Sequence, residues 1–107
     1  MINKVNGLLG LSAKARKIIS GTDVVLEKLN NGKVKLVIVA TDASDKTKKN
    51  MRYYSSKAKV PIYIYGTIFE NSKVIGERNK AVLGIIDINF ANAIIKVIHG
   101  GGEFGED

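Results

Sequence analysis

KLVIVA, at residues 35–40, is a nearly continuous run of apolar residues behind a single lysine. A strand with one solvent-facing side alternates apolar and polar residues, whereas this run indicates a strand that is buried on both faces. Helices must then cover both sides of the sheet that contains the strand. The run therefore predicts a layered α/β protein.

Helical and extended patterns alternate on both sides of this strand. The resulting arrangement is a compact α/β three-layer sandwich, formed by one domain over residues 1–99. We expect the Gly-rich acidic tail, residues 100–107, to be flexible. The apolar spacing predicts these elements in chain order: helix 4–15, extended segment 16–19, helix 23–30, strand 35–40, helix 45–57, strand 62–65, helix 67–75, strand 82–88 and helix 89–98.

A polar glycine turn, Ser20-Gly21-Thr22, opens the second predicted helix. Either Ser20 or Thr22 is expected to cap the helix by accepting from its first N–H groups, and Asp23 suits the positive helix end. Asn31-Gly32 supplies a left-handed stop. A helix start that faces solvent on a basic protein is also an anion site, so an ordinary capped helix and an RNA-binding element both fit this segment.

The composition excludes several classes of site. The chain has no cysteine, which excludes disulfides and thiolate chemistry, and its single histidine, His99, excludes a histidine-rich metal site. No apolar run reaches the ~18 residues of a membrane helix. Gly7 and Gly10 interrupt the apolar N-terminal stretch, and Arg16 and Lys17 follow it. We therefore expect the first helix of a cytoplasmic protein rather than a secretory signal.

The charge distribution favours a polyanionic partner. The formal net charge is +7, and residues 1–59 hold 13 of the 17 Lys and Arg residues. The tail carries three of the acids, so the body of the protein is more basic still. A basic excess of this kind favours RNA or DNA through counterion release and long-range attraction. A soluble basic surface without a nucleic-acid partner is the simpler alternative.

Candidate catalytic groups all have a simpler structural explanation. Asp42 and Asp45 follow the central strand, where they could share acid/base work or hold Mg²⁺, but a cap on the third helix by Ser44 or Asp45 is the favoured interpretation. His99 suits the negative end of the last helix. The Gly100–Gly102 run precedes no helix and is no phosphate loop. We expect no enzymatic activity, no cofactor and no metal.

Basic and aromatic side chains elsewhere are ambiguous. Four cations of the third helix, Lys46, Lys48, Lys49 and Arg52, could follow phosphates, although a solvated helix face is the commoner meaning. The four tyrosines could stack on bases, but sheet packing explains Tyr63 equally well.

Several short motifs together resemble the L7Ae/L30e ribosomal-protein family, with its bacterial YlxQ-type branch as the nearest match. Each motif is weak alone, and their order and spacing over about residues 5–98 make the resemblance specific. The motifs are Leu8-Leu9-Gly10-Leu11, Ala15-Arg16-Lys17-Ile18-Ile19-Ser20-Gly21, residues 35–40 with Asp42-Ala43-Ser44, Tyr53-Tyr54, Val60-Pro61, Ile75-Gly76, and Asp87 with Phe90-Ala91.

This resemblance implies an L30e-like four-stranded mixed sheet between helices, and binding to kink-turn RNA, an internal loop bent sharply around tandem G·A pairs. It implies that the second helix start enters the RNA groove and that the loop before the last strand covers the bulged nucleotides. With two flanking lysines, the expected RNA-binding residues are Lys17, Gly21, Thr22, Asp23, Val24, Lys28, Arg78, Asn79, Lys80 and Ala81. The expected partner is rRNA or mRNA, and we expect the protein itself to be monomeric and ribosome-associated.

Three residues depart from the family pattern at the second helix start. Asp23 stands at the place of the usual asparagine, Val24 replaces a polar residue, and Glu27 stands where a lysine is common. A carboxylate only accepts hydrogen bonds, whereas an amide also donates. Asp23 and Val24 resemble features of the YlxQ-type branch. These departures favour, as the alternative, a protein-interaction module that kept the fold with weakened RNA recognition.

Overall fold

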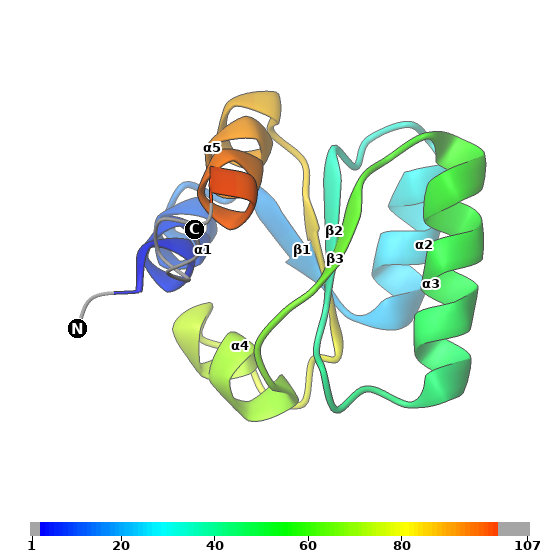
Figure 1. The fold of residues 1–107 in the computed structure, drawn as a ribbon, viewed down its shortest axis with the longest axis horizontal. Helices are drawn as coiled ribbons and strands as arrows, with labels where there is room; N and C mark the ends of the chain where they lie inside the picture. The colour runs from blue at the N-terminus through cyan, green and yellow to red at the C-terminus, as the bar shows by residue number, and fades with distance from the viewer. Residues whose placement is uncertain (1–2, 101–107) are drawn as a thin grey trace.

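The computed structural model describes residues 3–100 and has three layers (Figure 1). A four-stranded sheet lies between two helices on one side and three on the other. The elements are α1 Lys4–Lys14, β1 Ile18–Ser20, α2 Thr22–Asn30, β2 Leu36–Val39, α3 Asp45–Ala58, β3 Ile62–Ile64, α4 Ile68–Val74, β4 Val82–Ile85 and α5 Ile88–Gly100. The predicted α/β sandwich is confirmed.

The sheet is mixed, with strand order β1-β4-β2-β3. β4 is antiparallel to both β1 and β2, whereas β2 and β3 are parallel. The four-stranded mixed sheet that the resemblance implied is therefore confirmed.

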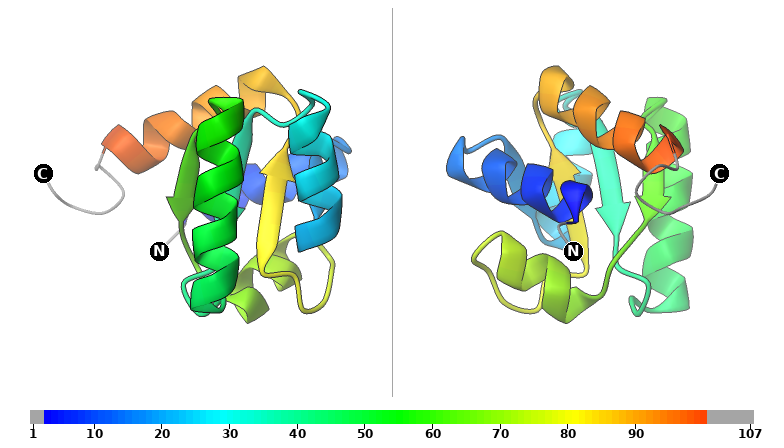
Figure 2. Two further views of the ribbon diagram at one scale, coloured as in Figure 1. Left: turned by 90° about the vertical axis from the view of Figure 1, so that its right-hand side faces the viewer. Right: turned by 60° about the vertical axis from the view of Figure 1, so that its left-hand side comes forward.

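β2 is buried on both faces, as its apolar run predicts. Leu36 and Ile38 belong to the core beneath α1 and α5, and Val37 and Val39 belong to the core beneath α2 and α3. Successive side chains of a strand point to opposite faces, so one four-residue strand contributes to both cores. Figure 2 shows α2 and α3 on one side of the sheet and α1 and α5 on the other.

Most boundaries lie within one residue of the prediction, and the larger differences include the end of β4 and the start of β1. β4 ends at Ile85 and α5 begins at Ile88, because the Asp87 carboxylate accepts from the Phe90 N–H at 3.0 Å and starts the helix inside the apolar run. Arg16, predicted as extended, has a φ of 59°, and the strand that follows it runs from Ile18 to Ser20. In both cases a polar residue, Asp87 or Arg16, forms a turn at a position that the apolar pattern alone does not mark.

The predicted C-terminal tail lies mostly outside the described residues. α5 includes Gly100, the first residue assigned to the tail, and residues 101–107 are not described. His99 lies in the last turn of α5, as predicted, and its Nε2 forms a hydrogen bond with the Tyr63 hydroxyl. Among residues 3–100, every helix is too short or too polar to cross a membrane.

Candidate nucleic-acid interface

The turn between β1 and α2 is built on Gly21. Its φ of 101° lies in the region that residues with a Cβ avoid, so glycine is required there. The Gly21 N–H donates to the Val82 carbonyl at 2.9 Å, which ties the helix start to the first residue of β4. This hydrogen bond holds the start of α2 in place relative to the sheet.

The first amides of α2 are free, and the predicted side-chain cap is wrong. Gly21 is the N-cap residue, and neither Ser20 nor Thr22 accepts a hydrogen bond from the helix start. Within residues 3–100, the N–H groups of Thr22, Asp23 and Val24 have no acceptor, whereas the Val25 N–H donates to the Gly21 carbonyl at 3.0 Å. Three donors at the positive end of a nine-residue helix remain available to a ligand.

The loop before β4 lies against this helix start. The Lys80 N–H donates to the Oγ of Ser72, a buried residue of α4, at 2.8 Å, and the Ala40 N–H donates to the Ala81 carbonyl at 2.9 Å. A Cβ atom placed on Gly21 would lie 3.8 Å from Lys80 Nζ. The Lys80 ammonium therefore lies over the start of α2, although the two segments are far apart in sequence.

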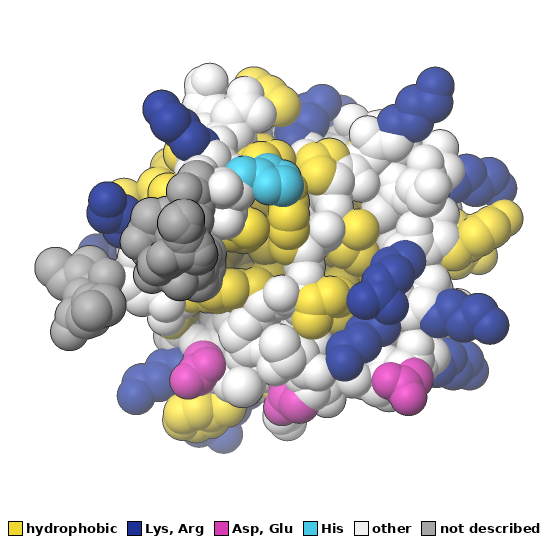
Figure 3. Space-filling view, in the orientation of Figure 1, with side chains coloured by type: hydrophobic (Ala, Val, Ile, Leu, Met, Phe, Trp, Pro, Cys, Tyr) yellow, Lys and Arg dark blue, Asp and Glu magenta, His cyan; other side chains and the backbone are white. Residues whose placement is uncertain are grey.

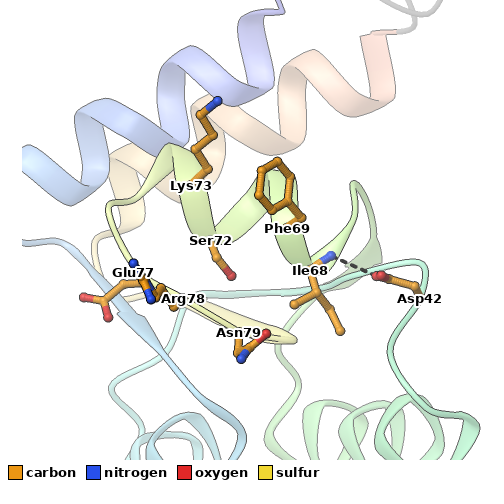
Figure 4. A pocket seen from close by; sticks show the side chains of 8 residues that line it. All are labelled: Asp42, Ile68, Phe69, Ser72, Lys73, Glu77, Arg78 and Asn79. Carbon is orange, nitrogen blue, oxygen red and sulfur yellow. Dashed lines mark hydrogen bonds between the residues drawn. The ribbon is translucent and has the colours of Figure 1, made fainter.

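A surface hollow of about 720 Å³ continues from this loop (Figure 4). α4 forms one wall and the loop residues Arg78 and Asn79 form another, with Asp42 beside the start of α4. The lining residues are Asp42, Ile68, Phe69, Ser72, Lys73, Glu77, Arg78 and Asn79. Asn79 has a φ of 55°, a conformation that asparagine adopts more readily than most residues.

The structure brings together most of the residues that the resemblance singled out. Gly21 and the first turn of α2, residues 22–24, form one side of the candidate interface. The loop residues Arg78, Asn79, Lys80 and Ala81 form the other. We refer to these two segments together as the α2–β4 surface.

Two predicted lysines lie away from the α2–β4 surface. The Ile86 N–H donates to the Lys17 carbonyl at 2.9 Å, so Lys17 lies at the opposite end of β4 from Ala81. Gly21 is four residues after Lys17 in a largely extended segment, which corresponds to about 13 Å. Lys28 is half-buried in the last turn of α2, about 9 Å along the helix axis from Thr22.

Two residues near this surface were missed by the sequence-based prediction. Ser72 anchors the loop backbone, and Phe69 is 72 % exposed in the wall of the hollow, with Lys73 Nζ 5.8 Å from its ring centroid. An aromatic residue next to Glu70, in a short predicted helix, is the sequence signal that could have indicated that Phe69 is exposed. Nothing local in the sequence indicates the partner of Ser72, because the bond joins a helix to a later loop.

Asp42, one of the two candidate catalytic carboxylates, has a structural role, and Asp45 lies in the first turn of α3. Asp42 Oδ1 accepts from the Ile68 N–H at 2.8 Å, and Ser44 caps α3 by accepting from the Thr47 N–H at 3.1 Å, as the favoured interpretation predicted. Over the described part of the chain, no group of three or more potential metal ligands occurs.

Comparison with known proteins identifies the family. Residues 3–93 match the model of the ribosomal protein L7Ae/L30e/S12e/Gadd45 family. The chain belongs to this family. An L7Ae/L30e-family relative, the RNA-binding protein YlxQ of Enterococcus faecium, is 37 % identical over 97 residues, which cover 91 % of this chain and 93 % of the relative.

Solved structures share the L7Ae/L30e-family fold. A Bacillus halodurans protein of unknown function matches with a TM-score of 0.88 and 31 % identity, over 92 % of this chain and 99 % of that one. The Giardia lamblia 15.5kD RNA binding protein matches with a TM-score of 0.76 over 92 % of this chain and 83 % of its own. At 22 % identity, the second match supports the fold alone.

Proposed function

We propose that this protein is a non-catalytic RNA-binding protein that recognises kink-turn-like structured RNA through the α2–β4 surface. The observation that carries the proposal is the meeting of Lys80 with the start of α2, where a cation and three free N–H donors share one surface. The family relative named as an RNA-binding protein supports RNA as the ligand.

The geometry of the α2–β4 surface fits a sharply bent RNA. Specific RNA recognition depends on shape and on the exposed edges of unstacked bases, both of which a kinked internal loop presents. Gly21 has no side chain, which allows an RNA strand to approach the backbone closely. The amides of residues 22–24 can donate to base or phosphate oxygens, and Lys80 and Arg78 supply the salt-dependent attraction.

The acidic residues of α2 are expected to change which RNA atoms are contacted. Asp23 and Glu27 are exposed, and Val24 is 43 % exposed. A carboxylate repels phosphate and accepts hydrogen bonds, so Asp23 is expected to face N–H donors on base edges. Affinity should then depend more on the loop cations than on α2 itself.

The expected ligand is an rRNA or mRNA that contains a kink-turn, and the protein is proposed to act as a cytoplasmic, ribosome-associated monomer. The structured RNA itself is the partner that the α2–β4 surface would contact.

Charge reversal at Lys80 tests the proposal. Lys80→Glu should weaken binding to a kink-turn RNA by about 10-fold or more at moderate salt and lower the salt slope by about 1, because one phosphate contact is lost. A salt-titrated gel shift measures both quantities. Lys96→Glu makes the same charge change at an exposed position of α5, away from the α2–β4 surface, and serves as the control. Equal affinity of the wild-type protein for a plain duplex would refute kink-turn recognition.

One feature favours the alternative of a protein-interaction module. Val24 is an exposed apolar residue between the exposed acids Asp23 and Glu27 on α2, a mixture that suits a protein partner as well as RNA. Pull-down before and after nuclease treatment separates the two functions. A stoichiometric protein that persists after nuclease would favour the module, and loss of all partners with nuclease would favour RNA.

A further inference from the structure

The outward face of α3 carries a continuous row of basic and aromatic side chains. Lys46, Lys49, Tyr53 and Lys57 are separated by three or four residues, so they lie on one face of the helix. All four are exposed, and this face is opposite the buried residue Met51. We call these four residues the α3 stripe.

The cations of the α3 stripe have no acidic partner. α3 contains five basic residues and a single acid, Asp45, and within residues 3–100 no ion pair involves the three stripe lysines. Like charges one helical turn apart, such as Lys46 and Lys49, destabilise a helix. A bound polyanion would remove this repulsion.

Exposed aromatic rings accompany these cations. Tyr53 is 59 % exposed and Tyr54 is 36 % exposed, and their rings meet edge to face with centroids 4.9 Å apart. Lys57 Nζ lies 5.9 Å from the centroid of the Tyr53 ring. Cations combined with exposed aromatic rings are the pattern by which proteins bind single-stranded nucleic acid, because the bases stack on the rings.

A small hollow lies beside the α3 stripe, between the C-terminal ends of α2 and α3. It is lined by Leu29, Asn30, Tyr54, Lys57 and Ala58, with a volume of about 190 Å³. Sites for drug-sized ligands usually exceed roughly 300 Å³, so this hollow suits one ring system rather than a whole small molecule.

The α3 stripe starts close to the α2–β4 surface and leads away from it. Asp42, three residues before α3, lines the same hollow as Arg78 and Asn79, and Figure 1 shows α2 and α3 starting at the same end of the molecule. α3 has 14 residues and therefore extends about 21 Å. Several Lys and Arg side chains lie on the side of Figure 3 where Figure 1 places α3.

We propose that the α3 stripe binds a single-stranded RNA segment that extends from the structured element on the α2–β4 surface. One base stacks on Tyr53, a neighbouring base occupies the hollow at Tyr54, and the three lysines contact phosphates. This inference rests on RNA binding as the proposed function, but it assigns a second site and a different form of RNA.

Binding of a single-stranded decanucleotide tests the stacking contact. Tyr53→Ala should weaken binding in fluorescence anisotropy by between about 5-fold and about 150-fold, the range for removing a ring beneath a stacked base. Tyr53→Phe keeps the ring and should bind within about twofold of wild type, because stacking tolerates loss of the hydroxyl. Tyr53 is exposed, so both variants should fold, which circular dichroism checks.

The salt dependence tests the lysines independently. A triple Lys46→Gln, Lys49→Gln, Lys57→Gln variant should lower the salt slope for the decanucleotide by about 2, at about 0.7 for each single-strand contact. The triple Lys14→Gln, Lys33→Gln, Lys96→Gln variant removes the same charge from exposed positions elsewhere and serves as the control. Wild-type binding by both Tyr53→Ala and the stripe triple would overturn the proposal.

A blunt-ended kink-turn duplex separates this proposal from the proposed function. The stripe variants should bind the blunt duplex as wild type does, and Lys80→Glu should bind the decanucleotide as wild type does. If Lys80→Glu leaves the duplex unaffected while Tyr53→Ala weakens the decanucleotide, the kink-turn proposal fails and the α3 stripe stands. If Tyr53→Ala weakens only the duplex, the inference fails.

Discussion

At the scale of single residues, Gly66 lies in the turn between β3 and α4 and is hydrogen-bonded to Thr41, which follows β2. Its carbonyl accepts from the Thr41 N–H at 2.8 Å and from the Thr41 hydroxyl at 2.6 Å. Its φ is +67°, and a Cβ atom there would lie 2.1 Å from Asn71 Oδ1. The Asn71 amide donates to the Tyr65 carbonyl at 2.8 Å and is buried. Backbone and side chains thus leave no space at this turn.

Substitution of this glycine should be costly. Gly66→Ala should lower the free energy of unfolding by more than about 1 kcal/mol, because alanine is strained at positive φ and its methyl group collides with Asn71. Urea denaturation measures the change. Gly7→Ala, in the interior of α1 with no atom within 4 Å of the added Cβ, should instead stabilise the protein by about 0.5–1 kcal/mol. Equal effects at both glycines would contradict this account of Gly66.

At the scale of elements, the segment between α4 and β4 is held by few bonds. Ser72 supplies one of them through its hydroxyl, which accepts from the Lys80 N–H, and the Ala81 carbonyl supplies another by pairing with Ala40. The intervening residues Glu77, Arg78 and Asn79 are exposed. The position of Lys80 over α2 therefore depends on Ser72.

Removal of the Ser72 hydroxyl should affect both stability and binding. Ser72→Ala leaves the Lys80 N–H without its acceptor, which should cost about 1–3 kcal/mol of unfolding free energy. Kink-turn affinity should fall as well, because the loop is no longer fixed against α2. Denaturation and gel shift measure the two effects. Ser56→Ala, exposed on α3, should change stability by less than about 0.5 kcal/mol. Unchanged RNA affinity in folded Ser72→Ala would contradict the anchoring role.

The sequence predicts most elements because each has its own local signal. The apolar run 35–40 indicates β2. Gly32 has a φ of 72° and forms the left-handed stop predicted after α2. Ser44 caps α3, as predicted. The boundary between β4 and α5 fails because Asp87 is a single polar residue inside an apolar run, and its capping bond depends on local geometry. The cap of α2 fails because β4 fixes Gly21 in place of a side-chain cap.

At the scale of the whole molecule, basic residues lie near both ends of β4, but only one of these ends carries the α2–β4 surface. The α2–β4 surface lies at one end with the start of α3, whereas Lys17 and Lys35 pair with Ile86 and Ile85 at the other end of β4. The basic excess of the sequence therefore indicates a polyanion without indicating which end binds it. Lys17 was predicted to lie near α2 because it is close to that helix in sequence. In the structure, β1 is antiparallel to β4, and Lys17 lies at the end of β4 that is far from the start of α2.

The proximity of Lys80 and Gly21 is a property of the folded molecule alone. Fifty-eight residues separate the two positions along the chain, and only the insertion of β4 between β1 and β2 brings the loop to the turn. The glycine turn and the basic charge indicated the start of α2 as a candidate anion site, whereas only the family resemblance named the loop before β4. The roles of the residues in RNA binding remain predictions that follow from this placement.

Backbone NMR of the protein during titration with a blunt-ended kink-turn RNA would show directly whether the α2–β4 surface binds the RNA. We expect the largest amide shifts at Thr22, Asp23 and Val24, because their free N–H groups acquire acceptors, and at residues 78–81, because the RNA lies against this loop. The amides of Val34 and Lys35, at the opposite end of the sheet, should stay unchanged and serve as the internal control. Unshifted amides at the start of α2, with shifts at residues 34–35 instead, would show that the RNA binds elsewhere.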